Sequence, residues 1–276
     1  MEKHLPGCSD KKVVLITGAS SGIGKDCAGF LNQKGYQVYG TSRKPGLETF
    51  PYPMIQMDVT EEASVKVGIA QVLEKEGRLD VVVNNAGMGI AGSLEDTTIE
   101  EIKFQMETNL FGVLRVCHGV IPVMRAQQFG VIINISSLAG LMGVPFQGAY
   151  SASKFALEGL TEVLRMEVKP FGIRTILIEP GDFNTGFTAN RIKTKNSQVN
   201  SVYSHFFTRA IEVMEADEKT GEKPHKIALL VDHIINHPSP KPRYMVGPIL
   251  QRIAAHLRKV LPQRLFEWLI MKNYKL

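Results

Sequence analysis

Residues 13–24 read VVLITGASSGIG. Val13–Thr17 is short, apolar and rich in β-branched residues, which predicts a buried strand, and the stretch from Ile23 onward has apolar residues at helical spacing. A glycine-rich turn therefore joins a strand to the start of a helix. Small residues let the backbone approach a pyrophosphate, and the free N–H groups of the helix N-terminus attract its phosphates. The arrangement is typical of a dinucleotide-binding unit; the alternative is a tight turn without a ligand.

Short apolar runs alternate with longer amphipathic stretches as far as about residue 180. This rhythm is typical of βαβ units that build a parallel sheet. The predicted strands are residues 13–17, 37–41, 54–57, 81–84, 131–135 and 174–178, and the predicted helices are 23–34, 61–75, 99–124 and 151–169. We predict an α/β fold with a doubly wound parallel sheet of the Rossmann type, in a single domain with a C-terminal helical extension.

The pattern changes after Gly181. A polar segment at 182–200 is followed by helical stretches at 206–216 and 226–236 and by a final strand at 243–247. A long connection inside a compact domain is commonly a functional lid. We therefore assign residues 1–248 to a dinucleotide-binding catalytic domain with a substrate lid at about 182–224. Residues 249–276 form a basic amphipathic C-terminal extension.

Composition excludes several classes of protein. Of the 276 residues, 44% are hydrophobic and 21% are charged, which is ordinary for a globular protein and unlike a disordered chain. The three cysteines lie far apart, so neither a disulfide framework nor a thiolate zinc site is expected, and no metal site is predicted. We expect no signal peptide or membrane anchor before Val13, and a cytoplasmic location.

The positive charge is concentrated at the C-terminus. The whole chain carries +5, and residues 249–276 hold six cations against one anion, Glu267. A nucleic-acid-binding protein would spread its basic residues along a groove, so no nucleic-acid partner is expected. A basic amphipathic helix can lie in a membrane interface or pack on the enzyme body. Packing on the body is the favoured prediction, and peripheral membrane contact is the alternative.

The turn after the second predicted strand indicates the cofactor. An acidic residue there would bind the ribose 2′-hydroxyl of NAD, whereas an arginine accommodates the 2′-phosphate of NADP. The sequence has Ser42, Arg43 and Lys44, with no carboxylate. A hydroxyl and a guanidinium suit a phosphate, so NADP(H) is predicted. The alternative is that these charges are solvated. Asp58, after the third strand, can bind an adenine amino group or start the next helix.

Tyr150 and Lys154 are four residues apart, so on a helix both side chains project from one face. An adjacent ammonium favours the phenolate and is expected to lower the pKa of the tyrosine, which makes it a usable acid and base. Ser137 follows the strand at 131–135, where a hydroxyl would enter the crevice at the sheet's edge. It could hold a substrate oxygen beside Tyr150.

In combination these motifs resemble the short-chain dehydrogenase/reductase family. The resemblance rests on TGASSGIG at 17–24, NNAG at 84–87, YSASK at 150–154 and Pro180-Gly181 followed by Thr185. It implies a catalytic tetrad of Asn109, Ser137, Tyr150 and Lys154, with Asn109 holding a water of a proton relay. Asn109 could also simply cap or bend a helix. The cofactor-binding residues predicted from the motifs are Gly18, Ser20, Ser21, Gly22, Ile23, Gly24, Ser42, Arg43, Asp58, Val59, Asn84, Ala86, Gly87, Tyr150, Lys154, Pro180, Gly181 and Thr185.

The predicted substrate is a small apolar hydroxyl or carbonyl compound. Aromatic and aliphatic residues follow Ser137 and Gly181 with few fixed charges, so we expect contacts from Ser137, Tyr150, Leu141, Val144 and Phe187. Within the family the chain most resembles the hydroxysteroid and retinol dehydrogenase-like branch. A steroid, retinoid or lipid alcohol or ketone is therefore expected.

Three alternatives stay open. One is an acyl-chain or sugar-like carbonyl as substrate. Another is a nucleotide-sensing NADPH-binding regulator, which would not need Ser137, Tyr150 and Lys154 in register. The third is a membrane-surface scaffold built around the basic tail. The family resemblance also implies a homodimer or homotetramer formed through the helices at 99–124 and 151–169.

Overall fold

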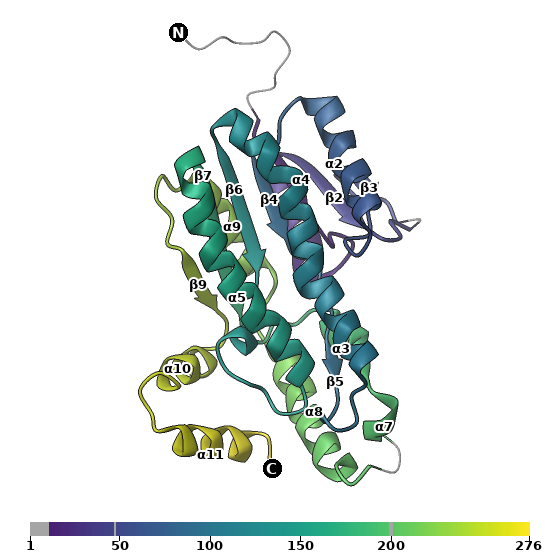
Figure 1. Cartoon of the computed structure of the whole chain (residues 1–276), viewed down its shortest axis with the longest axis vertical. Coiled ribbons are helices and arrows are strands. Elements are labelled where there is room, and N and C mark those ends of the chain that lie inside the picture. Colours follow the sequence, from purple (N-terminus) through teal and green to yellow (C-terminus); the bar gives the residue numbers. More distant parts are fainter. Residues whose placement is uncertain (1–10, 47, 199–200) are drawn as a thin grey trace.

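A seven-stranded parallel sheet forms the centre of the computed structural model, which describes residues 11–46, 48–198 and 201–276 (Figure 1). Its strand order is β3-β2-β1-β4-β6-β7-β9. The strands are β1 (Val13–Ile16), β2 (Gln37–Ser42), β3 (Met54–Gln56), β4 (Val81–Asn84), β6 (Gly130–Ile135), β7 (Ile173–Pro180) and β9 (Arg243–Val246). The order reverses between β1 and β4, where a doubly wound sheet opens a ligand crevice. The predicted fold class is confirmed.

Helices cover both faces of the sheet because its strands alternate apolar side chains between two cores. In β1, Val13 and Leu15 enter one core, while Val14 and Ile16 enter the other. The first core packs against α2 (Glu62–Glu76), α4 (Gly112–Gln127) and α5 (Gly148–Val168), which lie in front of the sheet in Figure 1. The second packs against α1 (Gly22–Gln33) and α9 (His225–Asn236).

The helix predicted at 99–124 is interrupted. The structure has α3 (Ile99–Met106), a π-helical turn η1 (Glu107–Phe111) and then α4. Single π-helical turns inside helices are frequent at functional sites. Here the turn contains Asn109, which is fully buried. Two further single turns, η2 (Leu138–Gly140) and η3 (Lys169–Phe171), flank α5.

The segment at 182–224 is folded over one end of the sheet. It contains α6 (Phe187–Asn190), β8 (Ile192–Lys193), α7 (Lys195–Gln198) and α8 (Ser204–Lys219). β8 pairs with the short strand β5 (Ile90–Ala91), which the sequence did not predict. On α8, Phe207, Ala210, Ile211 and Met214 form a small core with Ala91.

The C-terminal extension forms two helices, α10 (Ile249–Leu257) and α11 (Gln263–Asn273). Ala255 of α10 and Phe266 of α11 are buried against Leu138 and Met142. The extension therefore packs on the body with one side, as predicted. Within the described residues no helix is both long and apolar enough to cross a bilayer. The N-terminal stretch in which no leader is expected lies mostly outside the described residues.

Candidate active site

A cavity of about 990 Å³ lies at the carboxyl edge of the sheet and extends from the glycine-rich turn to α10 and α11. A smaller cavity of about 100 Å³ adjoins it and is lined by residues that follow β2 and β3, including Arg43, Asp58 and Val59. Arg43, Ala86 and Gly87 line both cavities. A long ligand with a phosphate-bearing middle and two ends would fit along this path.

The glycine-rich turn has the backbone geometry that a pyrophosphate requires. Gly18 has φ +66°, and a Cβ there would lie 2.9 Å from the Cα of Ala86. Gly22 has φ +54°, and a Cβ there would approach the Cβ of Thr185 at 3.4 Å. All residues of the first turn of α1 are described by the structure, and none of them is acidic. The side chain of the N-cap residue, Ser21, makes no capping hydrogen bond to this turn. Gly22 and Ile23 of this turn line the cavity, so the N-terminus of α1 lies at its wall, and the residues present fit a dinucleotide.

Most of the residues predicted to bind the cofactor line one of the two cavities. Those that do so are Gly18, Ser20, Ser21, Gly22, Ile23, Arg43, Asp58, Val59, Ala86, Gly87, Tyr150, Lys154, Pro180, Gly181 and Thr185. One carboxylate oxygen of Asp58 also accepts hydrogen bonds from the backbone and hydroxyl of Thr60, at 2.9 and 2.8 Å. Asp58 therefore lines the smaller cavity and also organises the turn before α2.

Three predicted cofactor residues line neither cavity within the described chain. Asn84 is buried inside the fold, where its amide donates to Asn134 Oδ1 at 2.8 Å. Gly24 is a packing position, because a Cβ there would lie 2.4 Å from both Asn85 Nδ2 and Gly18 O. The Ser42 hydroxyl bonds the backbone of Lys44. These three residues serve the architecture of the site.

Tyr150, Lys154 and Ser137 all line the larger cavity. Tyr150 and Lys154 lie one turn apart on α5, and the Lys154 ammonium is 5.8 Å from the centre of the Tyr150 ring. Lys154 Nζ donates to the carbonyl of Ile135 at 2.8 Å. Ser137 begins η2 directly after β6 and is close enough to hydrogen-bond the Tyr150 phenol. The predicted triad is brought together.

Asn109 lies behind this triad and does not line either cavity. Its side-chain carbonyl accepts from Met88 N at 2.9 Å, and its amide donates to Met88 O and to Ser153 Oγ at 3.0 and 3.1 Å. Ser153 Oγ in turn donates to the carbonyl of Tyr150 at 2.7 Å. The side chain is thus occupied by protein groups and joins the loop after β4 to α5. The predicted water relay would have to use the Asn109 backbone.

Burial dominates the electrostatics of the triad. It lowers the pKa of Lys154 to about 8 and raises the pKa of Tyr150 to about 12, because each charged form loses its hydration. The expectation that Lys154 lowers the pKa of Tyr150 is not met in this structure, because burial raises that pKa and the groups that oppose burial are Ser137 and Arg191. The neutral phenol is favoured, and a neutral phenol is a proton donor.

Comparison with known proteins identifies the family. A model described as short chain dehydrogenase matches residues 12–196. A 3-ketodihydrosphingosine reductase of Bacteroides thetaiotaomicron is 45% identical over 263 residues, which span 95% of this chain and 98% of that protein. The chain belongs to the short-chain dehydrogenase/reductase family. It is an oxidoreductase of a family that binds NAD(P)(H).

Solved structures agree with this assignment. A short-chain dehydrogenase from Streptomyces avermitilis is 32% identical, with a TM-score of 0.81, and the match covers 94% of this chain and 96% of that one. An alcohol dehydrogenase from Thermococcus sibiricus, complexed with 5-hydroxy-NADP, is 26% identical with a TM-score of 0.68, over 87% of this chain and 97% of that one.

The substrate end of this oxidoreductase is partly as predicted. Val144 and Phe187 line the cavity, and the Phe187 ring centre lies 5.7 Å from that of Tyr150. Leu141 does not line it within the described chain; it packs against the core that holds α10 and α11. Sequence spacing places Leu141 after Ser137 but does not show that the single turn η2 directs it toward the extension.

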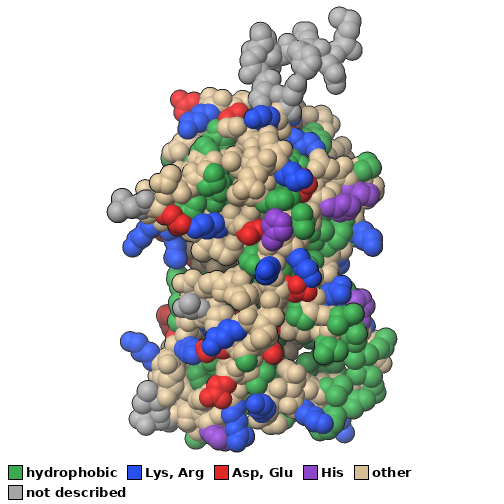
Figure 2. All heavy atoms as spheres, turned by 180° about the vertical axis from the view of Figure 1, so that it is seen from behind, with side chains coloured by type: hydrophobic (Ala, Val, Ile, Leu, Met, Phe, Trp, Pro, Cys, Tyr) green, Lys and Arg blue, Asp and Glu red, His purple; other side chains and the backbone are tan. Residues whose placement is uncertain are grey.

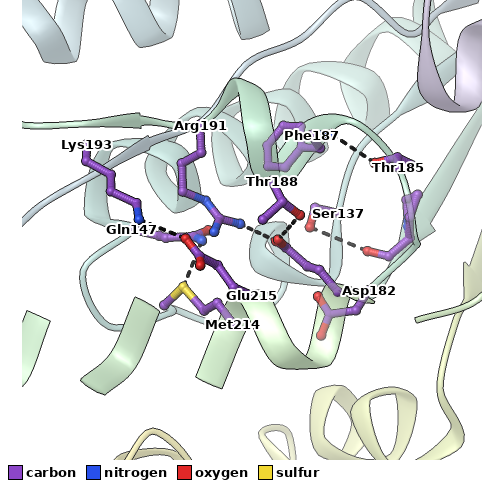
Figure 3. Close-up of polar contacts among 12 residues, drawn as sticks. Ser137, Gln147, Asp182, Thr185, Phe187, Thr188, Arg191, Lys193, Met214 and Glu215 are labelled. Atoms are coloured by element: carbon purple, nitrogen blue, oxygen red, sulfur yellow. Dashed lines mark hydrogen bonds and ion pairs between the residues drawn. The ribbon is translucent and has the colours of Figure 1, made fainter. Parts of the chain in front are cut away.

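Charged groups at the cavity are the main feature that the sequence analysis missed. Asp182, Asp217 and Glu218 line it, so the expectation of few fixed charges is wrong. Arg191 forms an ion pair with the Glu218 carboxylate, which also accepts a hydrogen bond from the Thr188 hydroxyl, and Figure 3 shows Arg191 and Thr188 directed at the same acceptor group. Gln147, whose amide donates to Met214 Sδ at 3.1 Å, lines the same region. No periodicity marks these residues, because they meet only through the packing of α8.

The pKa of Lys154 predicts an alkaline limit to activity. Below pH 8 the ammonium is charged and bonded to Ile135, and as pH rises through about 8 it loses that charge. We expect kcat/KM for carbonyl reduction to fall above about pH 8, measured as a pH profile at saturating cofactor. A guanidinium stays protonated, so Lys154→Arg should move this limb to higher pH. Wild-type activity that is flat to pH 9.5 would contradict the assignment.

Proposed function

We propose that this protein is an NADP(H)-dependent reductase of long-chain ketones that carry an amino group near the carbonyl. The carrying observation is the composition of the cavity beside Tyr150, where carboxylates meet apolar walls. The relative with 45% identity is named for the reduction of 3-ketodihydrosphingosine, which is a long-chain amino ketone. Both observations favour an amphipathic lipid over a compact polar substrate.

The triad suggests how reduction proceeds. Ser137 and Tyr150 would hold the carbonyl oxygen, and Tyr150 would donate the proton that this oxygen gains as the carbonyl carbon is reduced. Lys154 orients the phenol from one turn below and is itself fixed by Ile135. The bound cofactor supplies the hydride, while the protein supplies orientation and proton handling. Such a set is unnecessary for a nucleotide sensor, so it favours the enzyme over that alternative.

Arg43 supports NADP(H) as the cofactor. It follows β2 and lines both cavities at the point where they join. A guanidinium there can pair with a 2′-phosphate through two parallel hydrogen bonds. The relative from Thermococcus sibiricus was solved with an NADP derivative, which agrees with this choice.

Asp182 supports an amino group on the substrate. It lines the cavity together with Tyr150 and Asp217, whereas Glu218, which also lines it, is paired with Arg191. Burial raises the pKa of Asp182 to about 6, so the carboxylate is charged at neutral pH. A substrate ammonium beside the carbonyl would regain part of the hydration energy that this carboxylate has lost. A steroid or retinoid offers no such group.

The outer face of η1 and α5 supports the predicted homodimer or homotetramer. Phe111, Phe155, Val163 and Met166 are between 40% and 68% exposed there, although they are large and apolar. Pairing this face with a second copy would remove these side chains from water.

The substrate assignment is tested with purified protein, NADPH and a panel of ketones. We expect turnover of a long-chain 2-amino-3-ketone, and slower turnover of steroid, retinoid and sugar-like carbonyls. Tyr150→Phe removes only the phenolic oxygen and should reduce kcat about 10²–10⁴-fold while NADPH binding, followed by fluorescence, stays intact. Equal turnover by wild type and Tyr150→Phe would refute the role of the tyrosine.

The cofactor assignment is tested by the double variant Ser42→Asp with Arg43→Ile. The carboxylate repels a 2′-phosphate and accepts a hydrogen bond from a 2′-hydroxyl, so kcat/KM should fall for NADPH and rise for NADH. Lys44→Ala is the control, since Lys44 lines neither cavity in the described chain. An NADPH preference that survives the double variant would place the phosphate site elsewhere.

The amino-group contact is tested by Asp182→Asn, which keeps an acceptor for Gln251 but removes the charge. We expect KM for the amino ketone to rise about tenfold, with KM for a neutral long-chain ketone unchanged. In the wild type the same rise should appear as pH falls through about 6, where Asp182 becomes protonated. Glu212→Gln, on the exposed side of α8, is the matched control. Equal effects on both ketones would argue against the contact.

A further inference from the structure

The two C-terminal helices expose an unusually apolar surface, which we name the tail patch. Its members range from 39% exposed (Leu269) to 76% exposed (Leu250). The patch consists of Ile249, Leu250, Ile253, Val260, Leu265, Trp268, Leu269 and Met271. In Figure 2 it forms much of the hydrophobic area at the lower right of the molecule. Large contiguous apolar surfaces on soluble proteins commonly mark interaction sites.

The patch is not the surface of a loosely attached tail. The opposite sides of the same helices are fixed to the body: Ala255 and Phe266 are 2% and 5% exposed. The Gln251 side chain both accepts from Asp182 N at 2.9 Å and donates to the Asp182 carboxylate. With their inner side held in this way, α10 and α11 present the apolar residues outward in a fixed arrangement.

The charge of the same segment indicates what covers the patch. Six cations, Arg252, Arg258, Lys259, Arg264, Lys272 and Lys275, accompany one acidic residue. The Lys272 ammonium lies 5.2 Å from the centre of the Trp268 ring. A second copy of the chain would bring six more cations to the same interface, and these would repel. An anionic surface with an apolar interior complements both features, and a bilayer with acidic lipids has this chemistry.

The cavity reaches the patch. Leu250 and Leu269 line the cavity and are also exposed, and Leu257, Phe266 and Ile270 add to its apolar lining. Part of the cavity wall is therefore formed by residues that would lie against the lipids. A long alkyl chain could follow this apolar lining from the bilayer into the cavity that Tyr150 also lines.

We propose that α10 and α11 dock on an anionic membrane surface and admit the lipid substrate directly from the bilayer. The tail patch would lie at the boundary between headgroups and acyl chains, with the cations among the headgroups. Docking itself depends only on the tail patch and its charge. The delivery of a lipid ketone rests in addition on the proposed function.

Flotation of the full-length protein with vesicles tests the docking. The vesicles are phosphatidylcholine alone or phosphatidylcholine mixed with phosphatidylglycerol. We expect the wild type to float with the anionic vesicles, and the triple variant Ile253→Ser, Val260→Ser and Trp268→Ser to bind about tenfold more weakly. These three residues do not line the cavity in the described chain, so turnover of a soluble short-chain ketone should not change.

Two controls separate the patch from general surface effects. The triple variant Val67→Ser, Val202→Ser and Leu229→Ser removes exposed apolar side chains elsewhere and should float like the wild type. Arg258→Glu with Lys259→Glu should weaken binding to anionic vesicles, and high salt should weaken wild-type binding in the same direction.

Equal flotation of the wild type and the tail-patch variant would overturn the proposal, and so would equal binding of neutral and anionic vesicles. A third outcome would also overturn the proposal: the wild type does not bind vesicles but forms oligomers, and the tail-patch variant does not form them. This result would show that the patch joins two copies of the chain. Vesicle binding without turnover of vesicle-borne amino ketone would support docking and refute the proposed function. Turnover of the amino ketone without vesicle binding would support the proposed function and refute docking.

Discussion

The site depends on one constraint, which is that all seven strands of the main sheet run parallel and end at the same edge. Five of these strand ends each add one named component to that edge. Gly18 follows β1, Arg43 follows β2, Asp58 follows β3, Ser137 follows β6 and Asp182 follows β7. Because the strand order reverses between β1 and β4, helices leave the sheet on opposite faces and the edge stays open there. Residues far apart in sequence thus line one continuous path.

The same edge couples the catalytic centre to the C-terminal helices. Glu158 on α5 and Glu179 on β7 are both buried, and both pair with Arg243 of β9. Burial raises the pKa of Glu158 to about 7, so the arginine compensates groups that are costly to bury. Gly247 follows β9 at φ +137°, and a Cβ there would lie 3.0 Å from the backbone nitrogen of Gly181. The helix that bears Lys154 and the strand that leads to α10 are therefore held in one arrangement.

The sequence was sufficient for those features that depend on local spacing. The glycine-rich turn and the four-residue separation of Tyr150 and Lys154 specify their own geometry, and the structure has both. The buried orientation of the Asn84 side chain could also have been predicted from the sequence. Alternation along β4 places Asn84 on the same side as Val82, which lies in the core. The π-helical turn at Asn109 and the carboxylates beside Tyr150 could not be predicted in this way. Both features depend on the packing of segments that are far apart in sequence. Neither one produces a periodic pattern within a single segment.

The lining of the cavity is charged in one part and apolar in another, and this difference limits which substrates can bind. Tyr150 and the carboxylates of Asp182, Asp217 and Glu218 line the cavity, and its outer part, formed by α10 and α11, is mainly apolar and includes the exposed Leu250 and Leu269. A rigid apolar substrate would leave the half-buried Asp182 carboxylate without a cationic partner from the substrate. A compact polar substrate would leave the apolar outer part filled with water. The proposed substrate, with a cationic, carbonyl-bearing head and a long alkyl chain, would suit both kinds of lining if its chain extends toward the C-terminal helices.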